Sequence, residues 1–148
     1  MEVYFYHLEH QTLDRVLPVL LERALEKGWR AVVEAGSQER LEALDTHLWT
    51  YSEDSFLPHA TRKDASPDRQ PVFLTTGEDN PNQAEVRFLV DGARLGGHDG
   101  YQRAVILFDG TDPEALARAR EEWTHAKSKG HAVTYWQQGQ SGKWERKA

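Results

Sequence analysis

Strand-like apolar runs alternate with segments of helical periodicity along this chain, and this order limits the possible folds more than any other feature. Residues 3–6 are β-branched and aromatic, and residues 30–35 are apolar in their middle, so both runs predict strands. The segment between them predicts a helix, ended by Gly28, because apolar residues recur in it at spacings of three and four: Leu13, Val16, Leu17, Leu20, Leu21, Ala24 and Leu25. A strand–helix–strand order favours crossover connections and a mainly parallel sheet.

The predicted helices carry residues that commonly cap or interrupt a helix. Thr12 and Ser37 are expected to cap two helices, the second of which has leucines at helical spacing along one side. Pro18 lies inside the first helix and lacks a backbone donor, so a kink or a late start is expected in that helix.

The second half of the chain continues the alternation. Strands are expected at residues 72–75, 85–90, 103–108 and 132–136, and loops at residues 52–70 and 94–100. Asp112 followed by Pro113 is a favourable helix start, and Gly130 ends that helix after about residue 129. We therefore predict a single three-layer α/β/α domain over residues 1–148, with a mixed but mainly parallel sheet of nucleotide-binding-like topology.

Composition excludes several classes of protein. The chain has no cysteine, so disulfides, thiolate metal sites and cysteine catalysis are excluded. Its formal net charge of −6 argues against gripping a phosphate backbone as the main activity and leaves room only for a small local basic patch. No apolar run approaches the roughly 20 residues of a membrane span, and the N-terminus does not resemble a secretory signal. These features predict a cytoplasmic protein with no membrane contact and no direct nucleic-acid contact.

The motif search predicts no catalytic residue, no metal site and no cofactor. Residues 7–10, which follow the first strand, lack the glycines of a dinucleotide-binding loop, and the glycine-rich residues 95–100 lack Walker spacing. None of the seven histidines stands in the HExxH spacing. Ser37 follows a strand, but the second glycine of a nucleophile elbow is missing, and a helix cap explains this serine without chemistry.

Two segments are richer in aromatic residues than a simple core requires. The first, residues 48–59, brings three aromatic residues and a proline from a helix into a loop, where they either anchor the loop or form a protein-binding patch. In the second, Arg120 precedes Trp123 by three residues and is its neighbour on a helix surface. Such a pair suits a peptide that ends in an aromatic residue with a free carboxylate, although a solvated arginine beside a core tryptophan has the same spacing.

Several blocks of the sequence, in order and over nearly the full length, resemble the family of chi subunits of bacterial DNA polymerase III. The blocks are residues 44–49 (LDTHLW), 55–59 (SFLPH), 70–72 (QPV), 107–110 (LFDG), 119–123 (AREEW), 130–131 (GH), 135–138 (YWQQ) and 142–145 (GKWE). The block from Leu48-Trp49 to Pro58-His59 is the most specific of them. The resemblance implies an α/β fold without a nucleotide site and a non-catalytic accessory subunit acting in DNA replication.

The resemblance also implies partners. Members of the family join the psi subunit, which attaches them to the clamp loader, and they bind the acidic C-terminal tail of single-stranded DNA-binding protein. Trp49, Phe56 and Pro58 match positions on the psi-binding face, which some members also offer to a DNA-repair helicase.

Arg120 and Trp123 match positions in the pocket for the acidic tail. The chain departs from the family pattern at Thr124, where a lysine is expected, so Lys127 or Arg118 is expected to hold the acidic residues of the tail instead.

Two other classes of function stay open at this stage. A small α/β hydrolase or transferase would use the loop at residues 94–100 beside a polar pocket at the carboxyl ends of the strands. A domain that binds single-stranded nucleic acid would use Trp49, Tyr51 and Phe56 as stacking platforms, against the acidic charge balance.

Overall fold

The computed structural model describes residues 1–50, 57–64, 66–96 and 100–148, and all the strands in this part of the chain belong to one sheet. The strands are β1 (Glu2–Leu8), β2 (Ala31–Ala35), β3 (His59–Ala60), β4 (Val72–Thr75), β5 (Val86–Val90), β6 (Arg103–Asp109), β7 (Ala132–Gln138) and β8 (Trp144–Arg146). Their order is β3-β4-β2-β5-β6-β1-β7-β8, and every neighbouring pair is parallel except β7 and β8. The predicted mixed but mainly parallel sheet is therefore confirmed.

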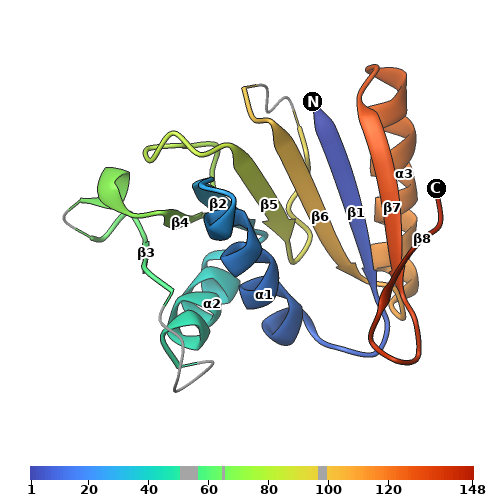
Figure 1. Cartoon of the computed structure of the whole chain (residues 1–148), viewed down its shortest axis with the longest axis horizontal. Helices are drawn as coiled ribbons and strands as arrows, with labels where there is room; N and C mark the ends of the chain where they lie inside the picture. The colour runs from blue at the N-terminus through green and yellow to red at the C-terminus, as the bar shows by residue number, and fades with distance from the viewer. Residues whose placement is uncertain (51–56, 65, 97–99) are drawn as a thin grey trace.

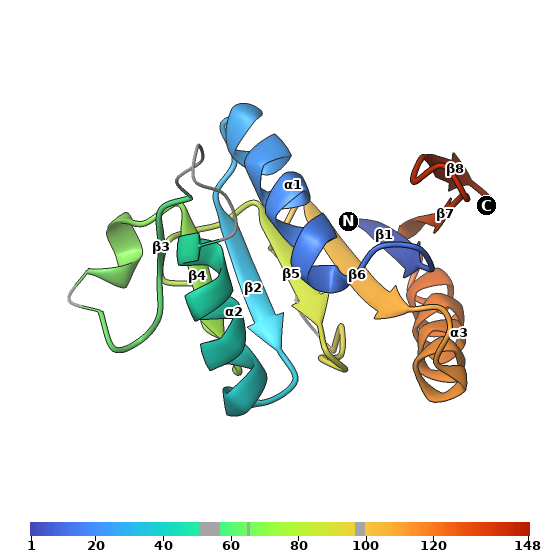
Figure 2. The same ribbon diagram turned by 90° about the horizontal axis from the view of Figure 1, so that it is seen from below.

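Three α-helices cover the two faces of the sheet (Figures 1 and 2). Helices α1 (Leu13–Glu26) and α2 (Gln38–Thr50) lie on one face, and α3 (Pro113–Ser128) lies on the other. Strand residues that alternate along β1 and β6 divide between two apolar clusters: Val105 and Leu107 pack on the side of α1, whereas Val3, Phe5 and Ile106 pack on the side of α3. The predicted three-layer α/β/α architecture follows from this division.

The proline inside α1 does not delay the helix, which begins at Leu13 as its apolar spacing predicts. Pro18 lacks the N–H that would donate to the carbonyl of Asp14 four residues earlier. The imidazole Nε2 of His47, on α2, lies 2.5 Å from that carbonyl oxygen and donates to it instead. His47 therefore satisfies the backbone of a neighbouring helix, which accounts for a polar residue at this contact.

Local details at the chain's ends and loops differ in part from the prediction. Ser37 accepts a hydrogen bond from the Arg40 N–H at 3.2 Å, and Asp112 accepts one from the Glu114 N–H at 3.0 Å, so both helix starts are confirmed. Thr12 stands at the N-cap of α1, as predicted, but its side chain makes no capping hydrogen bond. The predicted loop at residues 52–70 contains β3 and a single helical turn, η1 (Pro67–Arg69), and the tail contains β8.

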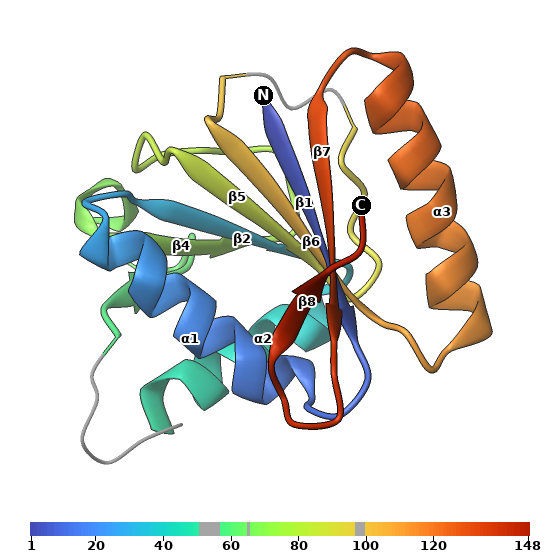
Figure 3. The same cartoon turned by 45° about the vertical axis from the view of Figure 1, so that its right-hand side comes forward.

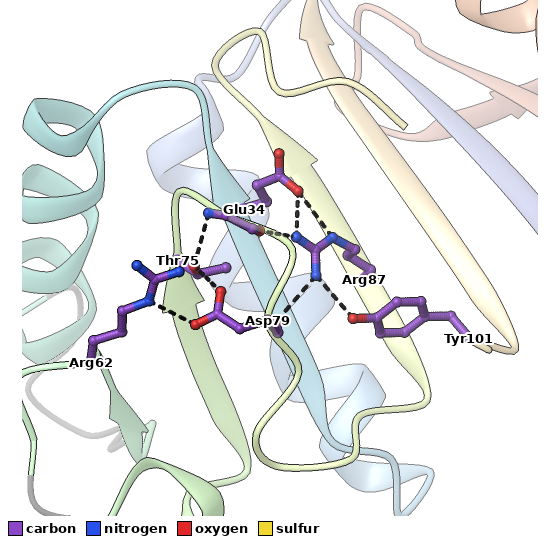
Figure 4. A network of polar contacts seen from close by, with 7 residues as sticks. Glu34, Arg62, Thr75, Asp79, Arg87 and Tyr101 are labelled. Atoms are coloured by element: carbon purple, nitrogen blue, oxygen red, sulfur yellow. Dashed lines mark hydrogen bonds and ion pairs between the residues drawn. The ribbon is translucent and has the colours of Figure 1, made fainter. Parts of the chain in front are cut away.

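A buried polar network fastens the loop after β4 to the face of the sheet opposite α1 and α2 (Figure 4). Arg87 of β5 is fully buried and forms an ion pair with Glu34 of the neighbouring β2. Its guanidinium also donates to the Tyr101 hydroxyl at 2.9 Å and to the backbone carbonyls of Gly77 and Asp79. These bonds satisfy the donors of a cation removed from water, which a buried arginine requires.

Asp79 extends this network to the surface and should make stability depend on acid pH. Arg62 donates a 2.7 Å hydrogen bond to its carboxylate, and this contact is the largest of the effects that lower the Asp79 pKa from 3.8 to about 2. The stabilisation is therefore complete above about pH 4 and is lost as the pH falls toward 2. In the wild-type protein, protonation of Asp79 should lower the free energy of unfolding by about 1 kcal/mol over this range, after allowance for solvent screening. This contribution should be absent in Asp79→Asn when urea unfolding is compared at several pH values. An unchanged pH profile in Asp79→Asn would contradict the assignment.

Candidate functional site

Helix α3 presents a half-buried tryptophan between two strands of the sheet. The Trp123 ring packs edge-on against Phe5 of β1, with 5.5 Å between ring centroids, and against Tyr135 of β7, with 5.7 Å. The Lys127 ammonium lies 4.9 Å from the centre of the Trp123 ring, one helical turn further on. The side chains of Trp123 and Lys127 thus meet at the surface between α3 and β7, and both belong to the predicted tail site.

Tyr135 ties this surface to a polar chain that the sequence did not reveal. Its hydroxyl lies 2.6 Å from Nδ1 of the buried His7, and His7 Nε2 lies 2.9 Å from a carboxylate oxygen of Glu9, without the alignment of a hydrogen bond. Burial raises the Tyr135 pKa, and the positive charge of the nearby Arg120 partly opposes this rise. Arg120, which is exposed on α3, is therefore near Tyr135, and Lys127 lies over the Trp123 ring that packs against Tyr135.

The structure separates Arg118 from this group. Two residues along an α-helix are about 200° apart around its axis, so Arg118 and Arg120 point in different directions. Arg118 instead lines a cavity together with Ala115 and Glu122, and neither Arg120 nor Trp123 lines it. Of the two cations expected to replace the missing lysine at position 124, Lys127 is therefore the one beside Trp123.

The cavity that Arg118 lines has a volume of about 650 Å³ and lies at the carboxyl ends of β1, β5 and β6. The chain leaves β1 toward α1 on one face of the sheet and leaves β6 toward α3 on the other, which makes this a topological switch point of the kind where α/β proteins bind ligands. Arg94, from the loop proposed for a small enzyme, also lines it. The open pocket that this alternative requires is thus present.

Some of the polar groups around the cavity are engaged with their neighbours. Arg40 pairs with Asp91 at 3.1 Å, and the Asp109 carboxylate accepts hydrogen bonds from the side chain and the N–H of Thr111, which lower the Asp109 pKa. The described lining contains threonine, histidine and carboxylate side chains but no serine, cysteine or lysine. Within the described ranges, no three or more His, Asp or Glu side chains gather as metal ligands would.

The second predicted site lies at the opposite edge of the sheet. Trp49, in the last turn of α2, has half of its surface exposed, and its ring centroid lies 4.2 Å from that of His59 in the edge strand β3. His59 is buried and its Nε2 lies 3.0 Å from the Asp45 carboxylate of α2, so this polar contact and the ring contact hold Trp49 beside the edge strand.

Pro58 is half-buried immediately before β3, so the structure places it near Trp49 at the same edge. Phe56 and Tyr51, which the sequence joined to this patch, lie outside the described residues. Figures 1 and 2 show that α2 and β3 lie at one end of the sheet and α3 and β7 at the other. The two candidate sites are therefore separated by the width of the sheet.

None of the described helices has the length and apolar character needed to cross a membrane.

The sequence is similar to those of known proteins. The family model described as DNA polymerase III chi subunit, HolC, matches residues 1–134. A protein of Rickettsia prowazekii (strain Madrid E), named probable DNA polymerase III subunit chi, is 29% identical over 85 residues. This match covers 57% of the present chain and 52% of the Rickettsia protein, so the chain spans about half the length of that relative.

Proposed function

Because the chain belongs to the DNA polymerase III chi subunit family and is thus an accessory subunit in DNA replication, we propose that it is a non-catalytic adaptor within the holoenzyme. One end of the adaptor binds the acidic C-terminal tail of single-stranded DNA-binding protein at Arg120, Trp123 and Lys127. The other end binds the psi subunit, and through it the clamp loader, at Trp49, Phe56 and Pro58. The same end is available to a repair helicase in place of psi.

The observation that carries the tail contact is the grouping of cations and aromatic rings between α3 and β7. Lys127 lies over the Trp123 ring, and Arg120 acts on Tyr135, which packs against the same tryptophan. A guanidinium at this point can hold a terminal carboxylate with two parallel hydrogen bonds, while the last aromatic side chain of the peptide packs against Trp123. Lys127 adds attraction for the preceding acidic residues.

The strength of such a contact suits an adaptor. A short peptide held by one exposed arginine and one half-buried ring should bind with a micromolar Kd, or about −8 kcal/mol. The charged part of the attraction is screened over about 8 Å at physiological ionic strength, so the affinity falls with added salt. Many tails on coated single-stranded DNA raise the local concentration, and this avidity compensates for weak single contacts.

The β3 edge supports the longer-lived attachment. Trp49 is a large apolar side chain with half of its surface exposed, and tryptophans that enter a partner's pocket often carry a large share of the binding free energy. Desolvated packing of this kind dissociates more slowly than a salt-sensitive peptide contact.

The tail contact is tested by measuring fluorescence anisotropy with a labelled peptide that copies the C-terminus of the organism's single-stranded DNA-binding protein. Arg120→Ala should weaken binding by about 1.5–3 kcal/mol, or roughly 10- to 150-fold, because it removes a charge-assisted hydrogen bond. Arg118→Ala removes the same charge from the other side of α3 and should change the affinity much less. Removal of the last residue of the peptide should abolish binding to the wild-type protein.

A wild-type affinity in Arg120→Ala would rule out the proposed tail site. A loss confined to Arg118→Ala would instead indicate that the tail enters the cavity at the carboxyl ends of the strands, which Arg118 lines and Arg120 does not. Equal losses in both arginine variants would indicate attraction by charge alone and would also contradict the proposed site. The absence of any binding at high micromolar protein would contradict the tail-binding half of the adaptor function and leave the β3 edge as the remaining partner site.

A further inference from the structure

The sheet face that carries α1 has a second aromatic surface, over β1, β7 and β8, which we call the aromatic face. It consists of Tyr4, Tyr6, Trp136 and Trp144, all of them half-buried. Tyr6 lies nearly parallel to Trp136, with 6.5 Å between ring centroids, and Trp144 packs edge-on against Tyr6 at 4.9 Å. In Figure 3, α1 lies over the strands on the other side of β1, and neither α1 nor α2 covers β7 or β8.

Three cations border the aromatic face, two of them from the end of α1 and one from β6. The Arg103 guanidinium lies 4.1 Å from the centre of the Tyr4 ring and 5.0 Å from that of the Trp29 ring. The ammonium of Lys27, at the C-cap of α1, lies 4.3 Å from the centre of the Trp29 ring. Arg23, one helical turn before Lys27, is close enough to Tyr6 to oppose the rise that burial causes in its pKa. Aromatic rings thus contact two of these cations, Arg103 and Lys27, at the surface.

A cavity of about 200 Å³ opens between α1 and the aromatic face. Tyr4, Tyr6 and Phe88 belong to its apolar wall, and the cations Arg23, Lys27 and Arg103 also line it. Its described lining includes no acidic residue, although acids outnumber bases in the chain and the net charge is −6. Glu2 pairs with Arg103 at 3.0 Å from outside the cavity, whereas no described carboxylate forms an ion pair with Arg23 or Lys27. Positive charge is therefore concentrated at this aromatic pocket, although the chain as a whole is negatively charged.

We propose that the aromatic face and the cavity beside it bind single-stranded DNA. Aromatic rings that stack on bases, together with cations that follow the phosphates, are the two components by which proteins hold single strands without reading their sequence. The cavity is smaller than a drug-sized ligand requires, and it suits one flat ring of the size of a nucleobase. An acidic peptide would use the cations but not the succession of rings along β1, β7 and β8.

This inference rests on the membership of the chain in a DNA polymerase subunit family and not on the proposed tail contact. The two surfaces lie on opposite faces of the sheet, since Trp123 packs against Phe5 on the side of α3 and Tyr4 and Tyr6 point to the side of α1. The adaptor can therefore hold a strand on one face while the tail of single-stranded DNA-binding protein occupies the other. Few phosphates are contacted, which agrees with a weak, auxiliary contact rather than coating of the strand.

The test is fluorescence anisotropy of the full chain, without any partner protein, with a labelled oligothymidine of about 15 nucleotides. Three phosphate contacts predict that the logarithm of the binding constant falls with the logarithm of salt concentration with a slope of about −2. Arg23→Glu/Lys27→Glu should weaken binding at least 10-fold and flatten this slope. Arg23 is exposed on α1 and Lys27 is exposed at its C-cap, so the double variant should keep the circular dichroism spectrum and the tail-peptide affinity of the wild-type protein.

The matched control is Arg69→Glu/Lys129→Glu, which changes the net charge by the same amount at exposed positions away from the aromatic face and should leave DNA binding unchanged. Photo-crosslinking with 5-iodouracil in the strand should label Tyr4, Tyr6 or Trp144. No binding at high micromolar protein, equal losses in the two double variants, or cross-links that map to α3 would each overturn the proposal. Polyglutamate competing as well as DNA would also overturn it, since the surface would then select charge alone.

Discussion

Replacing Arg87 by methionine is expected to lower the free energy of unfolding by about 3–5 kcal/mol, the usual cost of removing one partner from a buried ion pair. Methionine fills much of the same space, so the loss comes from the groups left behind rather than from a cavity. The Glu34 carboxylate loses its counter-ion, and the backbone carbonyls of Gly77 and Asp79 lose a donor (Figure 4). Urea unfolding followed by circular dichroism measures the change.

Two further variants separate the buried pair from its exposed extension. Glu34→Gln combined with Arg87→Met removes both charges and should recover part of the stability, because no uncompensated charge then stays buried. Arg62→Met breaks an ion pair in which the arginine side chain is 63% exposed, and it should cost much less than Arg87→Met. A stability of Arg87→Met within about 1 kcal/mol of the wild type would mean that water already satisfies these groups.

Most of the strands and helices follow from local patterns, and the elements that the sequence missed depend on distant partners. Helix α1 and strands β2 and β4 each contain enough apolar periodicity to be predicted on their own. Strands β3 and β8 contain two and three residues, and they are strands only because β4 and β7 pair with them. A pattern of two residues carries no periodicity, so no local rule could find them.

The candidate tail site shows the same division between local and distant information. Arg120 and Trp123 are neighbours by helical spacing, which the sequence specifies directly. Tyr135 reaches Trp123 through the pairing of β7 with β1, a contact between segments that are far apart along the chain. The alternation along β7 could have assigned Tyr135 to a face, but only the sheet order indicates that this face is the one that α3 covers.

Gly36→Ala is expected to destabilise the protein by about 1–3 kcal/mol. The upper end of this range is expected because the added methyl group would collide with backbone atoms rather than with a side chain. A Cβ at position 36 would overlap the carbonyl oxygen of Asp91, in the loop after β5. A flexible side chain could rotate away from such an overlap, but this loop contains Asp91 and Gly92 at positive φ and is fastened by the 3.1 Å ion pair between Arg40 and Asp91. The loop must therefore move as a unit or β2 must shift.

The same substitution distinguishes the role of Gly36 as a close contact from a role in a catalytic turn. Residues 91–94 line the 650 Å³ cavity, so hydrogen exchange of their amides should accelerate in Gly36→Ala, together with the loss of stability in urea. Gly139→Ala is the matched control, because a Cβ there would approach closely only the movable end of the Glu145 side chain, at 3.1 Å, and would meet the Lys143 carbonyl oxygen at an ordinary contact distance of 3.5 Å. Unchanged exchange at residues 91–94 would contradict the contact. Gly36 resembles part of a nucleophile turn in sequence alone. Its role in the structure is to leave room for the carbonyl of Asp91, some 55 residues away, because only a residue without a Cβ fits beneath that carbonyl.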